Sequence, residues 1–240
     1  GAGWSKLSKN RNRELSLSGQ VFLDTWNVIL PVELRSSTDI RGSEPRNSYS
    51  LSITLSQVLS RRLQLMFVMD LAFQEGQLAT LYHRTYFEDM SHKVEKLPDT
   101  RFKVPIGMRL NYFLADRYIL RTYYRYYQDS WGMSAHTAEL EVAIKVTPFL
   151  SISPFYRNHR QVAAKFFKPF AQHQTSEEFY TSDFDLSTQN TNFFGVGLRY
   201  APPGGIAGLS RLNTLELRFG RYERSTGLSA NIVTLSAKLK

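Results

Sequence analysis

Apolar and polar residues alternate in short segments along nearly the whole chain. The clearest segment is 137–146, where Leu140, Val142 and Ile144 share one side and Glu139 and Glu141 take the other. Alternation with a period of two predicts a β-strand, whose successive side chains point to opposite faces. We therefore expect an all-β, antiparallel protein.

Ten such segments can be recognised, and no segment between them reads as a covering helix. They lie near residues 14–26, 48–58, 62–75, 104–115, 117–128, 135–147, 149–158, 191–201, 211–223 and 227–239. Each has an apolar side and a polar or charged side. A transmembrane β-barrel with lipid outside and a wet interior fits this pattern better than a soluble β-sandwich, which stays the alternative fold.

The connections between these segments alternate in length. Short turns are expected at 59–61, 115–117, 147–148 and 201–210, and long connections at 36–46, 76–103, 128–133 and 159–190; the tight hairpin at 223–227 is the exception. Outer-membrane barrels have short periplasmic turns and longer outer loops. We expect one barrel domain over residues 1–240, with long outer loops near 76–103 and 159–190 and both termini in the periplasm.

Aromatic residues gather near the predicted strand ends. Toward the outer ends stand Tyr123, Tyr124, Tyr126, Tyr127 and Trp131. Toward the inner ends stand Tyr112, Phe113, Tyr118, Phe149 and Tyr200. This placement predicts two aromatic girdles at the headgroup level, although aromatic residues are also simply good strand formers.

Composition narrows the picture only in part. The chain has no run of 18 apolar residues, which excludes a transmembrane helix, and its mean hydropathy of -0.32 suits a wall in which only alternate residues meet lipid. The absence of cysteine excludes disulfides, zinc-thiolate sites and cysteine nucleophiles. Because the chain opens without a Met or a leader, we expect a processed protein or a piece of a longer one.

The chain is basic, with 30 Lys and Arg against 21 Asp and Glu and a pI near 9.7. These bases are scattered singly among the strands and do not line one helix or loop. This distribution predicts lumen lining and contact with the anionic headgroups of outer-membrane lipid and lipopolysaccharide, and it argues against nucleic acid.

Charged residues of both signs occupy the polar sides of the strands. The predicted lumen network comprises Asp24, Asp70, Arg109, Arg121, Arg125, Glu139, Glu141, Lys145, Arg157, Arg199, Glu216 and Arg218. Enclosed charges must pair or be hydrated, and a small barrel is only wide enough for its side chains. We expect a polar plug; the competing hypothesis is a solute-conducting pore whose arginines favour anions.

A barrel hydrolase is a further alternative, which would need a serine, a histidine and an orienting group. Ser134 and His136 share one side near the outer rim, with Asp129 nearby, but no nucleophile-elbow motif accompanies them. The plainer interpretation is that His136 and Asp129 hold the outer hairpin around Trp131 and Gly132. No histidine pair has metal-ligand spacing, and the sequence predicts no cofactor.

The long loop at 160–189 is rich in aromatic residues, namely Phe166, Phe167, Phe170, Phe179, Tyr180 and Phe184. So many aromatic side chains in one loop are not expected to be exposed to water. It predicts a lid over the barrel mouth or a docking surface, which the loop at 76–103 would complete.

Residues 123–132 read Tyr-Tyr-Arg-Tyr-Tyr-Gln-Asp-Ser-Trp-Gly and are followed by Ala-His-Thr at 135–137. The block resembles the signature of an outer-membrane barrel family, domain-of-unknown-function family three-five-seven-zero. Its outer-rim motif residues here are Tyr126, Tyr127, Asp129, Trp131 and His136. Further matches lie at 97–101, 105–107, 180–186, 199–203 and 227–231, so the resemblance spans roughly 48–240.

The resemblance implies the outer membrane of a Gram-negative bacterium and the carboxy-terminal portion of a longer protein. Members are often encoded near a small lipoprotein, a thioredoxin-like protein and a flavin-attaching enzyme, which suggests extracytoplasmic redox or assembly work, although the family's function is not established. We expect a non-enzymatic structural or docking component of an envelope complex, with other envelope proteins or a lipoprotein as partners.

Overall fold

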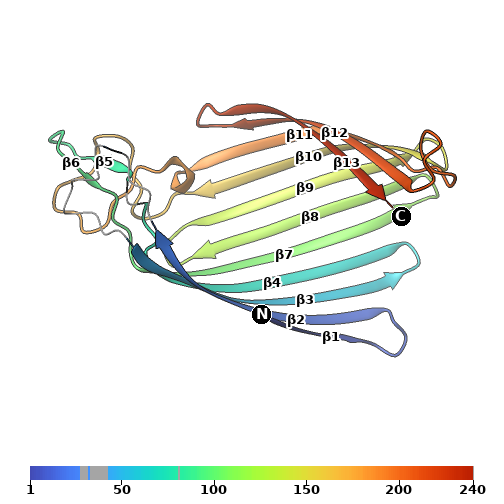
Figure 1. The fold of residues 1–240 in the computed structure, drawn as a ribbon, viewed down its shortest axis with the longest axis horizontal. Helices are drawn as coiled ribbons and strands as arrows, with labels where there is room; N and C mark the ends of the chain where they lie inside the picture. Colours follow the sequence, from blue (N-terminus) through green and yellow to red (C-terminus); the bar gives the residue numbers. More distant parts are fainter. Residues whose placement is uncertain (28–31, 33–42, 81, 240) are drawn as a thin grey trace.

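The computed structural model describes residues 1–27, 32, 43–80 and 82–239. These residues form one antiparallel sheet of eleven strands and one small two-stranded sheet (Figure 1). The large sheet comprises β1 (Ala2–Leu7), β2 (Arg13–Asn27), β3 (Ser43–Ser60), β4 (Leu63–Gly76), β7 (Thr100–Leu114), β8 (Tyr118–Asp129), β9 (Ser134–Lys145), β10 (Leu150–Val162), β11 (Gln189–Tyr200), β12 (Leu212–Arg224) and β13 (Ser229–Leu239). The small sheet pairs β5 (Arg84–Tyr86) with β6 (His92–Val94). The predicted all-β antiparallel fold is confirmed.

The ten predicted segments correspond to β2–β4 and β7–β13, but the predicted count misses β1. β1 alternates weakly, with Trp4 as the large apolar residue facing Leu17, and it forms by pairing with β2. In the register Ala2 lies opposite Gly19, so the first residues of β1 lie beside the middle of β2. The sequence had predicted this terminus at the short-turn end of the sheet. The carboxy-terminal end of β13 does lie there, beside Leu212.

Several strands reach further into the predicted loops than the sequence indicated. β7 begins inside the predicted loop 76–103, and β10 and β11 each take residues from the predicted loop 159–190. β3 begins inside the predicted connection 36–46, whose residues 36–42 lie outside the described part of the chain. No described helix is long and apolar enough to cross a membrane.

The register aligns the apolar sides of all the long strands on one face of the sheet, here called the apolar face. One row across five strands is formed by Ile144, Ile152, Leu198, Leu217 and Leu235. The opposite side, here called the polar face, carries the intervening residues. Strand pairing therefore turns a local alternation into two continuous surfaces.

The exposure of the two faces is the reverse of that in a soluble sheet protein. Leu140 and Leu217 on the apolar face are 45% and 46% exposed, whereas Glu141 on the polar face is 5% exposed. Among the described residues no second sheet packs on the apolar face. A β-sandwich would bury these leucines between two sheets, so the structure argues against that alternative.

The sheet is curved (Figure 1), and an ion pair across the polar face shows that this face lies inside the curve. The Arg218 guanidinium on β12 lies 2.7 Å from the Glu141 carboxylate on β9, although three strand spacings of about 4.8 Å separate these strands. Such a contact requires the sheet to bend toward its polar side. β1 and β13 form its two edges and are not paired with each other, so the sheet is not closed.

The tyrosine-rich block does not form the predicted outer girdle as a unit. Tyr124 and Tyr126 lie on the apolar face, whereas Tyr123 and Tyr127 lie on the polar face. Trp131 is buried among loop residues. The girdle prediction was therefore wrong for Tyr123, Tyr127 and Trp131. The two tyrosines face away from the apolar side because neighbouring residues of a strand point to opposite faces.

The long loops gather at one end of the sheet (Figure 1) and form what we call the loop cap, residues 77–80, 82–99, 129–133 and 163–188. Bridges join Phe87 to His173 and Lys96 to Tyr180, so the two long loops pack against each other. The cap has its own apolar cluster, formed by Ala79, Leu97, Trp131, Met133 and Ala164. The predicted association of the two loops is confirmed.

Candidate functional site

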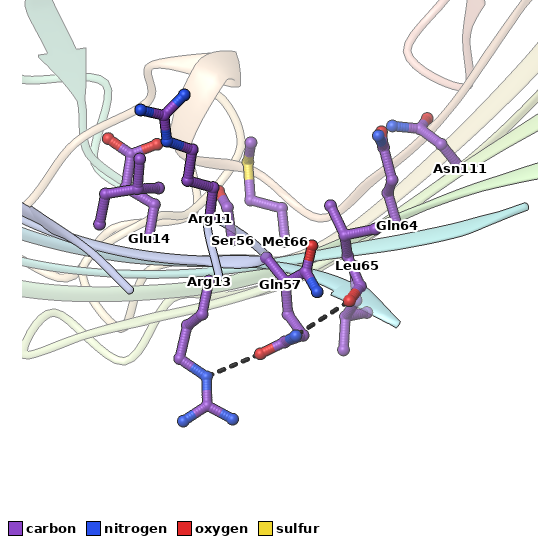
Figure 2. A pocket seen from close by; sticks show the side chains of 12 residues that line it. Arg11, Arg13, Glu14, Ser56, Gln57, Gln64, Leu65, Met66 and Asn111 are labelled. Carbon is purple, nitrogen blue, oxygen red and sulfur yellow. Dashed lines mark hydrogen bonds between the residues drawn. The ribbon is translucent and has the colours of Figure 1, made fainter. Parts of the chain in front are cut away.

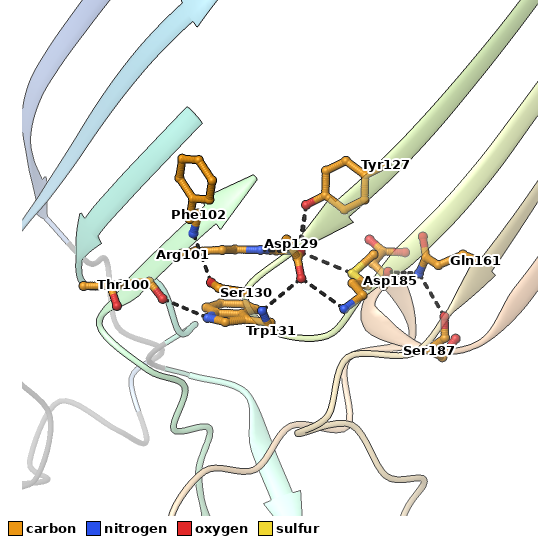
Figure 3. Close-up of polar contacts among 11 residues, drawn as sticks. Thr100, Arg101, Phe102, Tyr127, Asp129, Ser130, Trp131, Gln161, Asp185 and Ser187 are labelled. Atoms are coloured by element: carbon orange, nitrogen blue, oxygen red, sulfur yellow. Dashed lines mark hydrogen bonds and ion pairs between the residues drawn. The ribbon is translucent and has the colours of Figure 1, made fainter. Parts of the chain in front are cut away.

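The centre of the cap base is the buried carboxylate of Asp129, at the end of β8 (Figure 3). It accepts hydrogen bonds from Arg101 Nε at 2.9 Å, Tyr127 OH at 2.8 Å, and the backbone N–H groups of Trp131 and Met133, both at 3.0 Å. A carboxylate with several donors is well satisfied in a buried position. Asp129 therefore fixes the hairpin that joins β8 to β9.

Arg101 completes this arrangement from β7. Its guanidinium pairs with Asp129 and lies 4.2 Å from the centroid of the Trp131 ring, in cation–π contact. The indole Nε1–H of Trp131 donates to the Thr100 carbonyl at 2.9 Å. β7, β8 and the hairpin are thus joined through one charged pair and one aromatic ring.

A second set of contacts attaches the long loop at 163–188 to the same base. Gln161 Nε2, at the end of β10, donates to the carbonyl oxygens of Asp185 and Ser187 at 2.8 and 2.9 Å (Figure 3). The Lys165 N–H donates to the Trp131 carbonyl at 2.9 Å. The cap is therefore held to the sheet by hydrogen bonds that begin at the strand ends.

Within the cap, Glu95 from one long loop binds residues of both. Its carboxylate accepts from the Thr181 hydroxyl and from the Thr80 N–H, the latter at 2.6 Å. Burial raises the pKa of Glu95 above its ordinary value, and these two hydrogen bonds oppose that shift. Glu95 thus joins loop segments that are far apart in sequence.

His173 is fully buried and both of its ring nitrogens face acceptors: Nδ1 lies 2.6 Å from a Glu177 oxygen and Nε2 lies 3.0 Å from the Thr181 carbonyl. Burial acts to raise the pKa of Glu177, but hydrogen bonds from His173, Lys168 and the Gln174 N–H outweigh it and hold that pKa at about 2. The ionised Glu177 therefore stabilises the fold of this loop.

Six of the twelve predicted lumen residues form ion pairs on the polar face. Glu141 accepts from Arg121 at 2.6 Å and from Arg218 at 2.7 Å, and Arg218 lies 3.4 Å from Glu216. The remaining pair joins Arg157 and Glu139 at 2.6 Å. The predicted pairing of opposite charges is thus present across β8, β9, β10 and β12.

The other six predicted lumen residues form no ion pair with described residues, although Arg109, Lys145 and Arg199 line cavities together with members of this network. Asp70 accepts a hydrogen bond from the Ser52 hydroxyl at 2.5 Å, and the Arg109 guanidinium lies 5.4 Å from the Tyr123 ring centroid. Asp24 is exposed near the end of β2. Lys145 and Arg199 line a cavity of about 140 Å³ toward the short turns, and Arg125 lines a larger cavity below the cap.

The structure separates the outer-rim motif into two groups. Tyr127, Asp129 and Trp131 meet at the cap base, whereas Tyr126 and His136 lie on the apolar face with their ring centroids 5.1 Å apart. His136 Nδ1 lies 2.7 Å from the Tyr124 hydroxyl. The prediction that His136 helps to hold the hairpin was therefore wrong, and Asp129 lies on the other face.

Another cavity, of about 210 Å³, lies near the turns that join β1 to β2 and β3 to β4 (Figure 2). Arg13 Nε donates to Gln57 Oε1 at 2.6 Å, and Gln57 Nε2 donates to the Val58 carbonyl at 3.0 Å. This volume is below the usual range for a ligand site. We assign the cavity no ligand.

The sequence-based set omitted Arg101, Glu95, Gln161 and His173, which hold the cap together. Arg101 was visible as the last residue of the matched segment 97–101, but nothing local indicated that Asp129 would be its partner. The other three bind loop residues whose positions depend on the tertiary fold.

Replacing Asp129 by asparagine should destabilise the cap by about 3–5 kcal/mol, because the buried Arg101 would lose its counter-charge. Asp185→Asn is the matched control, since Asp185 also pairs with an arginine but its side chain is 78% exposed; its cost should stay within about 1 kcal/mol. Native-state hydrogen exchange of cap amides measures both. Equal losses in the two variants would contradict the central position of Asp129.

Acid should loosen the loop at 163–188 through protonation of Glu177. Its folded pKa of about 2 lies below the ordinary value of 4.5, so its contribution to stability is complete above pH 4.5 and is lost as the pH falls toward 2. Protease cleavage of this loop should rise over that interval. Glu177→Gln should flatten this dependence, whereas Glu178→Gln should leave it intact; the opposite pattern would refute the assignment.

Of the comparisons with known proteins, one identifies a family, and its description gives no function. The chain is similar in structure to BauA, the ferric preacinetobactin receptor from Acinetobacter baumannii, with a TM-score of 0.45 and 12% identity. The alignment covers 98% of this chain and 42% of the receptor chain, so the chain spans less than half the receptor's length. No curated protein matches it. The family model described as "Protein of unknown function (DUF3570)" matches residues 20–231, and the chain therefore belongs to the DUF3570 family, as the tyrosine-rich block predicted.

Proposed function

We propose that the chain forms part of an outer-membrane β-barrel of a Gram-negative bacterium and acts as a structural or docking component of an envelope complex. The observation that carries this proposal is the exposed apolar face opposite a polar face joined by ion pairs. Leu217 and Leu235 extend the apolar row as far as β13, and the Glu141 carboxylate lies within the curve of the sheet.

A lipid environment explains why so many apolar side chains are exposed on the apolar face, which would be unfavourable in water. Apolar surface removed from water stabilises a protein by about 25 cal/mol per Å², and hydrocarbon supplies that environment to a whole sheet face. Hydrocarbon also requires every backbone N–H and C=O to be paired within the protein. The proposal therefore includes partner strands on the β1 and β13 edges, which close the barrel.

The loop lengths support an orientation for this barrel. Outer-membrane barrels carry short turns on the periplasmic side and longer loops outside. The loop cap then faces the exterior, and the turn between β3 and β4, at 61–62, faces the periplasm. Tyr124 and Tyr126 lie near the outer end of the apolar face, at the level of lipopolysaccharide headgroups.

The cap supports the docking role because it has a folded interior and an exposed apolar surface. Tyr82 and Phe184 are exposed beside a cavity of about 540 Å³ that Arg84 and Asp183 also line. A surface of fixed shape loses little entropy on binding. We propose this cavity as the contact for another envelope protein or a lipoprotein.

The role is proposed as non-enzymatic because the residues of the hydrolase alternative are not assembled. His136 is engaged with Tyr124 on the apolar face, and Asp129 is saturated with donors on the other face. A solute-conducting pore is the second candidate. The cavities along the polar face favour it, as does Arg125, whose side chain has no polar partner among the described residues.

Leu217→Arg should prevent stable insertion of the full-length protein, because a cation on the lipid face of a barrel costs about 2–4 kcal/mol near the midplane. Ser50→Arg is the matched control, since Ser50 lies on the polar face. The measurement is the heat-modifiable band of folded barrel in washed outer membranes. Retention of that band in Leu217→Arg, or its equal loss in Ser50→Arg, would contradict the proposed lipid face.

Arg84→Glu should release the protein from its complex without affecting insertion, because it reverses the charge at the proposed docking cavity. Native gel electrophoresis in mild detergent should show the wild type in a larger assembly and the variant alone. Arg211→Glu, in an exposed turn at the other end, should behave as the wild type. A wild-type protein that migrates alone would refute the docking role.

Planar bilayer recordings separate the docking component from the pore. The structural role predicts no stable channels from the full-length protein. Stable openings whose conductance falls when Arg109, Arg121 and Arg125 are neutralised would establish the pore instead, since these arginines share the polar face.

A further inference from the structure

A cavity on the polar face lies directly below the loop cap and has a volume of about 680 Å³. Its walls come from β8–β13, together with Asp185 of the cap. Small-molecule sites in proteins have volumes of about 300–1,000 Å³. The cavity is therefore large enough for an organic ligand, and the structural role of the chain does not require it.

A row of side chains in direct cross-strand register forms the upper part of this cavity. The row runs across five strands as Arg125, Thr137, His159, Thr191 and Arg224. It holds two guanidinium groups, an imidazole and two hydroxyl groups, and no carboxylate. Thr137 Oγ1 and His159 Nδ1 lie 2.9 Å apart and bind each other, so the two guanidinium groups are the charged hydrogen-bond donors on this side of the cavity.

The carboxylates near this cavity neutralise two of its three arginines and leave Arg125 without a counter-charge. Arg224 pairs with Asp185 at 2.9 Å, and in the next row Arg157 pairs with Glu139 at 2.6 Å. Arg125 lines the same cavity, and its guanidinium has no hydrogen-bond or ion-pair partner among the described residues. A half-buried guanidinium without a counter-charge favours an anion, and its planar fork matches a carboxylate.

Aromatic rings form the lower part of the cavity. Phe193 and Tyr222 both line it, with their centroids 6.5 Å apart. Gly220 leaves room for the Phe193 ring, because a Cβ at that position would lie 2.5 Å from Phe193 Cε2. Phe193 also packs against Phe155, with ring centroids 5.1 Å apart, and the Arg157 guanidinium lies 5.9 Å from the Phe193 centroid. Along β11 and β12 the two rings lie two residues away from the basic row, so the cavity has an aromatic part beside its basic part.

We propose that this cavity binds a small organic carboxylate that carries an aromatic ring. Its carboxylate pairs with Arg125 and its ring packs against Phe193 and Tyr222. The proposal goes beyond the structural role, and it does not depend on how the barrel closes, because every lining residue belongs to β8–β13 or the cap.

Isothermal titration calorimetry of the full-length protein in detergent micelles, with benzoate as the probe, tests the site. We expect benzoate to bind, and benzamide, its uncharged isostere, to bind at least about tenfold more weakly, since a hydrogen bond to a charged group is lost. Cyclohexanecarboxylate should bind several-fold more weakly than benzoate because it lacks the flat ring. These three arms use the wild-type protein alone, so they do not depend on a variant that folds.

Arg125→Gln should weaken benzoate binding about tenfold. Lys145→Gln removes the same charge from the polar face in a different cavity and should change binding less than about twofold. Circular dichroism of each sample monitors the fold. No benzoate binding at about 10 mM, equal effects of the two substitutions, or inorganic phosphate binding as tightly as benzoate would each overturn the proposal.

Discussion

The structure depends on the different environments that its two sheet faces require. Leu140 is exposed and Glu141 is shielded, and strand pairing aligns the apolar sides of neighbouring strands on one face of the sheet. The charged side chains are satisfied because the sheet bends toward them, which brings Arg218 to Glu141 from three strands away. The apolar side chains are not covered by any other part of the described chain, and the membrane location that we propose would place them in hydrocarbon.

Because the inside of the curve is polar, the apolar core of the chain lies elsewhere. It lies in the loop cap, where Trp131 and Leu97 belong to one buried cluster. The Asp129 carboxylate connects this core to the ends of β7 and β8. The chain thus combines a sheet that depends on its surroundings with a cap that is folded by its own contacts, and these two properties fit a membrane component that presents a surface.

The sheet was largely predictable because a strand is recorded locally, in the alternation of neighbouring residues. The sequence predicted the face of Leu140 and the ion-pairing character of Glu141, but not that β1 would be recruited by pairing with β2. The cap was predictable only as an association of aromatic loops. The bond from Thr181 to Glu95 joins residues 86 positions apart, and no local pattern specifies such a partner. The local alternation likewise did not show that β1 and β13 would be the edges of a sheet that is not closed.

The most direct test of the central claim is a spin-label scan of β9, which the absence of cysteine in the chain makes simple. Single cysteines at successive positions of Ser134–Lys145 would be labelled in the full-length protein in lipid vesicles. The account predicts a period of two, with labels at positions 140 and 142 colliding with lipid-soluble oxygen and labels at 139 and 141 with a water-soluble nickel chelate. Uniform access to the chelate, or the reverse alternation, would contradict it.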